Sequence, residues 1–221
     1  MNQKEKAKRF AQLHVKGAPL LLYNAWDAGS AQSVLEAGAK AIATSVDAPV
    51  TVDFEGGYSE DDSELAVNIS RLIDLGVVGV NFEDRVVKGS GLYRVDRQAR
   101  RLGTIRKAAA QRRVDLFVNA RTDVFLEHGE DAAQAVDEAI ERAKAYADAG
   151  ASGFFIPGLT EDALIGQLCE AVTLPVNVMV MDGVPSNERL SKLGVARISY
   201  GPIPYISAMN VLQQEAKKVL S

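Results

Sequence analysis

The chain has 221 residues, of which 47% are hydrophobic and 24% are charged, and its formal net charge is −4. This length allows one large domain with a substantial core, and the absence of a lysine–arginine stripe argues against a nucleic-acid partner. The single cysteine excludes an internal disulfide and fits a reducing compartment. No apolar run approaches the roughly 20 residues of a membrane span, so we expect a cytoplasmic protein without a membrane partner.

Short apolar segments, typical of buried parallel strands, alternate with helical patterns along the chain. The strand candidates are 20–24, 40–44, 49–55, 77–83, 115–121, 152–157, 174–179 and 195–200. Glycine follows four helical patterns, at Gly38, Gly76, Gly150 and Gly194, where a left-handed residue would end each helix. Without a glycine-rich dinucleotide fingerprint, eight such strands predict a single (β/α)₈ barrel over residues 1–221, in preference to an open doubly wound sheet.

Polar residues mark the start of several helical patterns. Ser59, followed by acidic residues, predicts the cap of a helix over 59–75, and Thr160 predicts the cap of a helix over 160–172. Asp27 follows the first strand candidate and is predicted to cap the next helix.

The connection between the second and third strand candidates is too short for a parallel crossover. Only residues 45–48 separate them, whereas a crossover needs at least about 10–12 residues and usually contains a helix. The chain is also shorter than the roughly 250 residues typical of this barrel. We therefore expect that the second helix region is missing, through an omitted or excised segment.

Acidic residues stand at the ends of two consecutive strand candidates, where a parallel barrel has its active site. Asp53 and Glu55 lie two positions apart, about 7 Å along one strand, so we expect them to face the same way. Glu83 ends the next strand. Three carboxylates in one small volume repel one another, and Mg²⁺ would relieve that repulsion. The alternative is that each acid caps a helix or faces solvent.

A basic residue, Arg121, ends the following strand candidate, with Asn119 on the same face. Its guanidinium would hold a carboxylate or phosphonate of a small anionic substrate by two parallel hydrogen bonds. An ion pair with Glu83 or Asp123 that fixes the rim is the alternative, and both arrangements are compatible with each other.

Two further segments lie at the predicted active-site end. Thr44 and Ser45 end the second strand candidate, where hydroxyl and backbone N–H groups suit an oxyanion, although an ordinary turn fits the same residues. The loop over 86–94, in which Lys88 is followed by Gly89 and Gly91, fits a mobile lid or a plain surface loop.

These segments resemble the isocitrate lyase and phosphoenolpyruvate mutase superfamily. The matching stretches are 22–31, 41–45, 52–58, 79–84, 118–123 and 149–159, in the right order along most of the chain. The resemblance implies a (β/α)₈ barrel whose last helix is exchanged between the subunits of a homodimer or homotetramer. It also implies Mg²⁺ or Mn²⁺ and chemistry on oxo acids through a pyruvate-enolate-like state.

The resemblance also implies a role for each matching residue. Asp53 matches the principal metal-coordinating aspartate, and Glu55 and Glu83 match acids that hold the metal through water. Arg121 matches the arginine that binds the anionic group of the substrate, and the turn at 44–45 matches the one that holds a pyruvyl carboxylate. We expect Arg121 and Glu83 to be the catalytic residues.

The sequence departs from the superfamily at two places. Its isocitrate and methylisocitrate lyases carry a Lys-Lys/Arg-Cys-Gly-His lid, whereas residues 85–93 contain neither cysteine nor histidine, which argues against ordinary isocitrate cleavage. The second departure is the segment missing after Ser45, where relatives carry a helix, a covering loop and another acid near the metal.

The expected activity is carbon–carbon lysis of a substituted malate-type acid. Phosphonopyruvate or phosphoenolpyruvate mutase activity, or oxaloacetate decarboxylation or hydrolysis, is the alternative reaction. A catalytically silent barrel that binds oxo acids is the alternative of a different class, suggested by the lid and by the missing segment.

Overall fold

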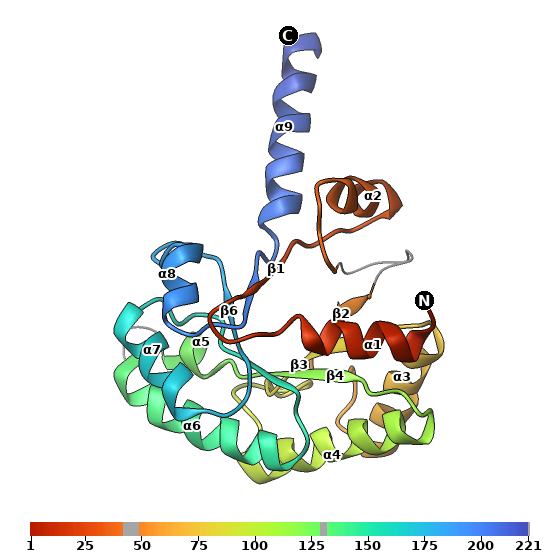
Figure 1. Ribbon diagram of the computed structural model, residues 1–221, viewed down its shortest axis with the longest axis vertical. Coiled ribbons are helices and arrows are strands. Elements are labelled where there is room, and N and C mark those ends of the chain that lie inside the picture. Colours follow the sequence, from red (N-terminus) through yellow and green to blue (C-terminus); the bar gives the residue numbers. More distant parts are fainter. Residues whose placement is uncertain (42–48, 129–131, 221) are drawn as a thin grey trace.

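A computed structural model describes residues 1–41, 49–128 and 132–220 of the chain. Strands and helices alternate through most of it (Figure 1). The elements are α1 (Gln3–Gln12), β1 (Leu20–Leu22), α2 (Ala28–Glu36), β2 (Thr51–Asp53), α3 (Asp62–Asp74), β3 (Gly79–Glu83), α4 (Val95–Gln111), β4 (Phe117–Arg121), α5 (Val124–His128), α6 (Ala132–Asp148), β5 (Gly153–Phe155), α7 (Asp162–Ala171), β6 (Val176–Met179), α8 (Asn187–Lys192), β7 (Arg197–Ser199) and α9 (Ile203–Leu220).

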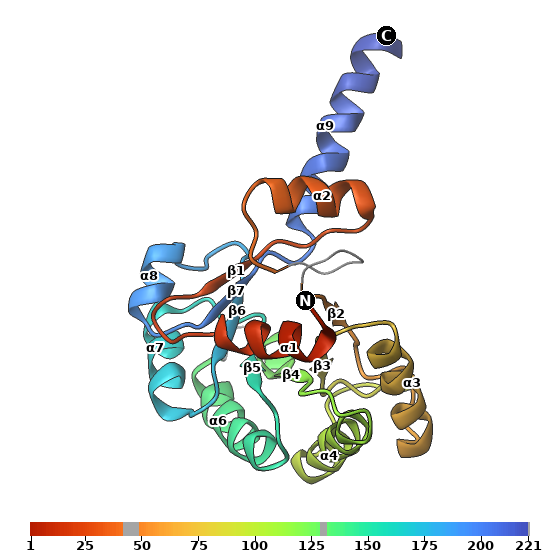
Figure 2. The same ribbon diagram turned by 45° about the vertical axis from the view of Figure 1, so that its right-hand side comes forward.

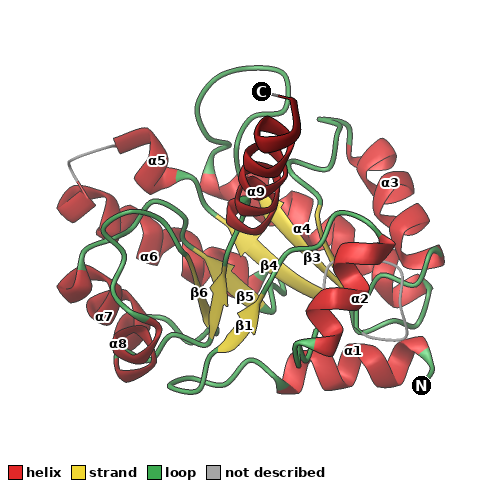
Figure 3. Ribbon diagram, turned by 90° about the horizontal axis from the view of Figure 1, so that it is seen from above, coloured by secondary structure: helices red, strands yellow, loops and turns green. Residues whose placement is uncertain are grey.

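The strands of the described residues form one parallel sheet of seven strands in the order β1-β7-β6-β5-β4-β3-β2. Helices α3, α4, α6, α7 and α8 lie in an arc around it (Figure 2), and Figure 3 shows the sheet from above. The predicted α/β class is therefore confirmed. The second strand candidate, 40–44, comes between β1 and β2 along the chain, but residues 40–41 form no strand and 42–44 lie outside the described residues.

Two apolar clusters hold these layers together. The larger cluster joins strand residues such as Val80 and Val118 to the inward sides of the surrounding helices. The smaller one joins Phe10 of α1 to Leu20 and Phe117, near the starts of their strands. Because Phe10 packs against the starts of these strands, α1 covers the end of the sheet opposite to the predicted active site. Full burial of one such phenylalanine stabilises the fold by about 1.5–3 kcal/mol.

Helix ends follow the glycine pattern of the sequence. The predicted left-handed conformation is confirmed at Gly38, Gly76, Gly150 and Gly194, with φ values between +91° and +96°. Asp27 caps α2 as predicted, and its Oδ1 accepts a hydrogen bond of 2.7 Å from the Ser30 backbone.

The last helix, α9, projects away from the rest of the molecule (Figures 1 and 2). Pro204 is its buried residue, and apolar side chains further along it, such as Leu212, are exposed. Among the described residues, no helix combines the length and apolarity needed to cross a bilayer.

Candidate active site

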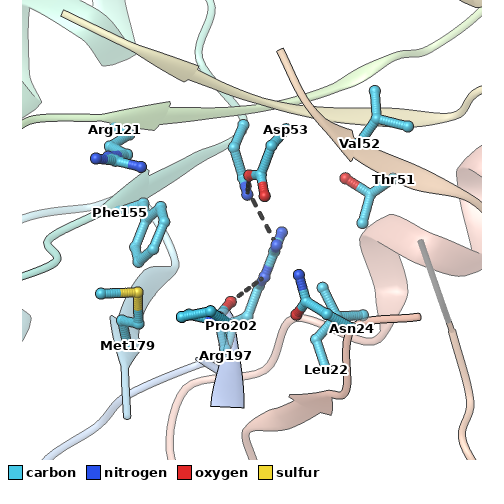
Figure 4. Close-up of a pocket in the computed structure, with 13 residues that line it drawn as sticks. Leu22, Asn24, Thr51, Val52, Asp53, Arg121, Phe155, Met179, Arg197 and Pro202 are labelled. Atoms are coloured by element: carbon cyan, nitrogen blue, oxygen red, sulfur yellow. Dashed lines mark hydrogen bonds between the residues drawn. The ribbon is translucent and has the colours of Figure 1, made fainter. Parts of the chain in front are cut away.

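A cavity of about 330 Å³ opens at the carboxyl ends of the strands, the position predicted for the site. Phe155 and Met179 form part of its apolar wall (Figure 4). Polar side chains that line it include Thr51, Asp53, Asn81, Arg121, Arg197 and Ser199.

The structure brings three of the predicted residues together at this rim. Asp53 ends β2 and lies opposite Asn81 of β3, whose Nδ2 donates a hydrogen bond to Asp53 Oδ1. Glu83 ends β3 in register with Arg121 of β4, and its Oε2 lies 3.0 Å from Arg121 Nη1. The parallel register of β2, β3 and β4 therefore sets the spacing of Asp53, Glu83 and Arg121.

Glu55 does not share the strand of Asp53, and that prediction is wrong. Strand β2 ends at Asp53, and Glu55 lies in a turn with a φ of +47°, in the left-handed region. The neighbouring Gly56 and Gly57 are the sequence signal for this turn. Glu55 Oε1 accepts a weak hydrogen bond of 3.4 Å from the Tyr58 hydroxyl, so Tyr58, which the sequence reading missed, belongs to the acidic side of the site.

Arg121 makes both of the ion pairs that the sequence left open. Its Nε and Nη2 donate to the two oxygens of the buried Asp123 at 2.6 and 3.1 Å, while Nη1 faces Glu83. Burial lowers the pKa of Arg121, but the hydrogen bonds and charge of Asp123 outweigh that effect and raise it overall. The guanidinium is thus held in place by Asp123, and a substrate anion at Nη1 would share it with Glu83.

The acids of the site influence one another. Partial burial raises the pKa of Glu83, the Arg121 charge opposes this rise, and the charges of Asp123, Glu55 and Asp53 add to it. Burial also raises the pKa of Tyr58, and the Glu55 charge reinforces that shift. Asp53 of β2, Glu55 in the turn after β2, and Glu83 of β3 therefore influence one another electrostatically.

Asn119 lies beneath the cavity rather than in its wall. It is buried, and its Nδ2 donates hydrogen bonds of 2.9 Å to the Oδ1 atoms of Asn81 and Asn177. Asn119 therefore supports the residues that line the site, whereas the prediction placed it against the substrate.

Arg197 is a cavity residue that the sequence reading missed. It begins β7, is 1% exposed and extends toward Asp53 (Figure 4). Its Nη2 donates a hydrogen bond to Asn81 Oδ1. The sequence feature that could have indicated Arg197 is its position as a single basic residue inside the apolar run 195–200. A cation in a buried strand must find an anion or hydrogen-bond acceptors inside the barrel.

The predicted lid is a narrow hairpin at its base. Arg85 and Leu92 pair as an antiparallel bridge, and the Val86 N–H donates to the Gly91 carbonyl at 3.0 Å. The other predicted cover, Thr44 and Ser45, lies outside the described residues.

The sequence model of the phosphoenolpyruvate phosphomutase family matches residues 10–46 and 42–220. The chain belongs to this family. A solved Burkholderia cenocepacia J2315 structure, provisionally named a phosphonomutase, is similar at 40% identity with a TM-score of 0.94, over 98% of this chain and 99% of that one. The predicted resemblance is confirmed, and the protein is an enzyme of this superfamily.

Two sequence relatives carry names of different reactions. The chain is 29% identical to the Escherichia coli 2-methylisocitrate lyase over 78% of its own length and 59% of that protein. It is 31% identical to a Pseudomonas savastanoi pv. phaseolicola oxaloacetate decarboxylase over 73% of its own length and 55% of that protein. This family member thus spans a little over half of each relative.

A divalent metal fits the residues of this phosphomutase-family site. Within residues 1–41, 49–128 and 132–220, no group of three or more histidine, cysteine or carboxylate side chains forms a ready metal cage. Asp53 nevertheless lines the cavity, and its Oδ2 accepts no hydrogen bond from the described residues, while Glu55 and Glu83 lie within electrostatic reach. One direct carboxylate with waters and outer acids suits Mg²⁺, which keeps several of its waters.

Proposed function

We propose that this chain is a lyase, dependent on Mg²⁺ or Mn²⁺, that cleaves a carbon–carbon bond in a small 2-oxo or 2-hydroxy acid. One observation carries the proposal: Asp53 and Arg121 line the same cavity of about 330 Å³, with Glu83 paired to Arg121 at 3.0 Å. A metal-binding acid and an anion-binding base in a small pocket suit a small anionic substrate.

The chain's own residues account for binding and proton movement. Arg121 would orient a carboxylate of the substrate, and the Glu83 carboxylate would accept the proton of a 2-hydroxyl group as its carbon becomes a carbonyl. The electron pair of the broken carbon–carbon bond then passes to the neighbouring carboxylate or carbonyl, which gives an enolate-like state. A metal ion held by Asp53 would supply positive charge that stabilises such a state.

Two alternative reactions use the same residues. Transfer at a carbon–phosphorus bond is supported by the 40% identity to the provisionally named phosphonomutase. Oxaloacetate decarboxylation is supported by the 31% identity to a decarboxylase. Both would need an anion at Arg121 and an enolate-like state near Asp53.

The test is a turnover screen with 2-methylisocitrate, 2,3-dimethylmalate, oxaloacetate and phosphonopyruvate, with Mg²⁺ and with EDTA. We expect turnover of at least one acid with Mg²⁺ and a loss on the order of 10²–10³-fold in Asp53→Asn. Asp96→Asn, on the outside of α4, is the matched control, since its carboxylate is exposed. Undiminished turnover in EDTA or in Asp53→Asn would count against the proposal.

The same proposal includes the cytoplasm as the compartment and a homodimer or homotetramer as the assembly. The exposed apolar side chains of α9 support the assembly.

A further inference from the structure

Arg197 has an incomplete set of partners at the floor of the cavity. Its Nε donates to Ser199 Oγ at 3.2 Å, and its Nη2 donates to Asn81 Oδ1 at 3.1 Å (Figure 4). Its Nη1 is buried and has no hydrogen-bond partner in the described part of the chain. Two of the three nitrogens thus fix the guanidinium, and the third is available for a ligand.

Arg197 also lacks a direct ion pair among the described residues. Asn81 links it to Asp53, since Asn81 Oδ1 accepts from Arg197 Nη2 and Asn81 Nδ2 donates to Asp53 Oδ1. Burial lowers the pKa of Arg197 to about 10, although the Asp53 charge opposes this shift, so the side chain remains a cation at neutral pH. A buried cation without an anion is costly, and a bound anion would remove that cost.

Thr51 adds a second unsatisfied group to the same floor. It is 2% exposed, lines the same cavity and has no hydrogen-bond partner for Oγ1 among the described residues. A threonine hydroxyl donates one hydrogen bond, so a carboxylate that entered the floor would meet two donors from β2 and β7.

We infer that Arg197 Nη1 and Thr51 Oγ1 form an anion subsite at the cavity floor, which binds one carboxylate of the substrate while Arg121 binds its other anionic group. This inference rests on the proposed function and deepens it, because two separate cationic positions select a dianionic acid over a monoanionic one. A dianion such as malate would then gain affinity from the floor that pyruvate does not.

A buried water is the competing explanation. His14 Nε2 is also buried and has no hydrogen-bond partner in the described ranges, and the Arg197 charge acts on His14. One water between Arg197, Thr51 and His14 would satisfy all three without any ligand, and Thr51 would then affect stability but not anion binding.

The test is calorimetric titration of the full chain with malate and with pyruvate, each in Mg²⁺ and in EDTA. We expect Thr51→Val and Arg197→Lys to weaken malate binding by about 10-fold or more, because each loses or misplaces a hydrogen bond to a charged group. Pyruvate binding should change much less. Thr104→Val on α4 is the matched control, since its hydroxyl only donates to the Arg100 carbonyl. Melting temperatures verify that each variant is folded, and Thr51→Val carries the test if Arg197→Lys does not fold.

The outcomes separate this inference from the proposed function. Unchanged malate binding in Thr51→Val, or no malate binding by the wild type, overturns the subsite whatever Asp53→Asn does to turnover. Loss of malate binding in Thr51→Val with EDTA present supports the subsite even if no Mg²⁺-dependent turnover is found.

Discussion

The half-buried His14 at the end of the sheet covered by α1 has an environment that resists protonation. The His14 ring stacks on Phe117 at 4.1 Å between centroids and meets the edge of Phe10 at 4.9 Å. Burial, followed by the positive charge of Arg197, lowers the pKa of His14 from 6.5 to about 3, although its hydrogen bond to the Phe10 carbonyl opposes the shift. His14 is therefore neutral at pH values where an exposed histidine is charged.

We expect this histidine to make the free energy of unfolding depend on pH. Between pH 6.5 and 3 the unfolded chain binds a proton at His14 that the folded chain does not, so stability is full above this window and falls as the pH falls. The slope is at most about 1.4 kcal/mol per pH unit. Urea unfolding between pH 7 and 4.5 should show a flatter dependence in His14→Gln than in the wild type.

His128→Gln is the matched control, because that side chain is 41% exposed. It should retain the slope of the wild type. His14→Gln should also be less stable at pH 7, since it loses the stacking on Phe117. Parallel pH curves for the wild type and His14→Gln would contradict the assignment.

For single residues, the sequence predicted which side chains lie at the ends of strands, but not where the backbone leaves the strand conformation. Asp53, Glu83 and Arg121 meet because parallel strands end at one edge, which the sequence pattern indicates. Glu55 lies in a turn beyond the end of β2, because its φ of +47° breaks the alternation of the strand. Arg197 was overlooked because its neighbours in the run 195–200 fit an ordinary buried strand.

One helix fixes the acid-bearing turn from outside the barrel. Arg101 of α4 is fully buried, donates from Nη1 to the Ser59 carbonyl at 3.0 Å and from Nη2 to the Gly56 carbonyl. Its guanidinium also lies over the Tyr93 ring, 4.6 Å from the centroid. The turn that carries Glu55 is thereby tied to α4.

We expect Arg101→Met to destabilise this turn more than the rest of the fold. It leaves two buried carbonyls without donors, at about 1–3 kcal/mol each, so the free energy of unfolding should fall by at least about 2 kcal/mol. Hydrogen exchange of residues 55–60 should rise. Arg100→Met is the control, because that side chain is 64% exposed and its loss should cost less than about 0.5 kcal/mol. Equal effects of the two substitutions would reject this role.

At the level of elements, helix ends were easier to predict than helix starts. A glycine just after a helical pattern favours a left-handed conformation that ends the helix there. At a helix start, by contrast, several neighbouring polar residues could each be the N-cap. The cap predicted at Ser59 is wrong: its Oγ accepts from the Asp61 N–H, and Asp61 caps α3. The cap predicted at Thr160 is also wrong, since α7 begins after Glu161 without a side-chain cap.

At the level of the whole molecule, the predicted parallel strands follow one another in the described sheet, and their predicted closure into a barrel stays a prediction. The described sheet ends at β1 and β2, which are consecutive in the chain. The family match breaks into 10–46 and 42–220 at this same point. Such a break is expected where a chain lacks residues that the family has, and it supports the predicted missing segment. The single barrel domain over 1–221 stays a prediction.

The exposed face of α9 makes an assembly of identical chains testable. Residues Tyr205, Leu212 and Val219 recur at seven-residue spacing and are 49%, 62% and 84% exposed. That spacing places them along one side of the helix, and apolar surface of this kind marks an interface. We expect a second copy to cover it, as the exchanged last helix of the superfamily implies.

Leu212→Glu combined with Val219→Glu should therefore convert the wild-type oligomer into a monomer, because two charges would be buried without partners in the interface. Light scattering after size-exclusion chromatography measures the mass directly. The control is Gln213→Glu with Gln214→Glu, which adds the same two charges to α9 next to Leu212 but outside the apolar row. It should keep the wild-type mass. A monomeric wild type, or a Leu212→Glu and Val219→Glu variant with the wild-type mass, would show that α9 has another role.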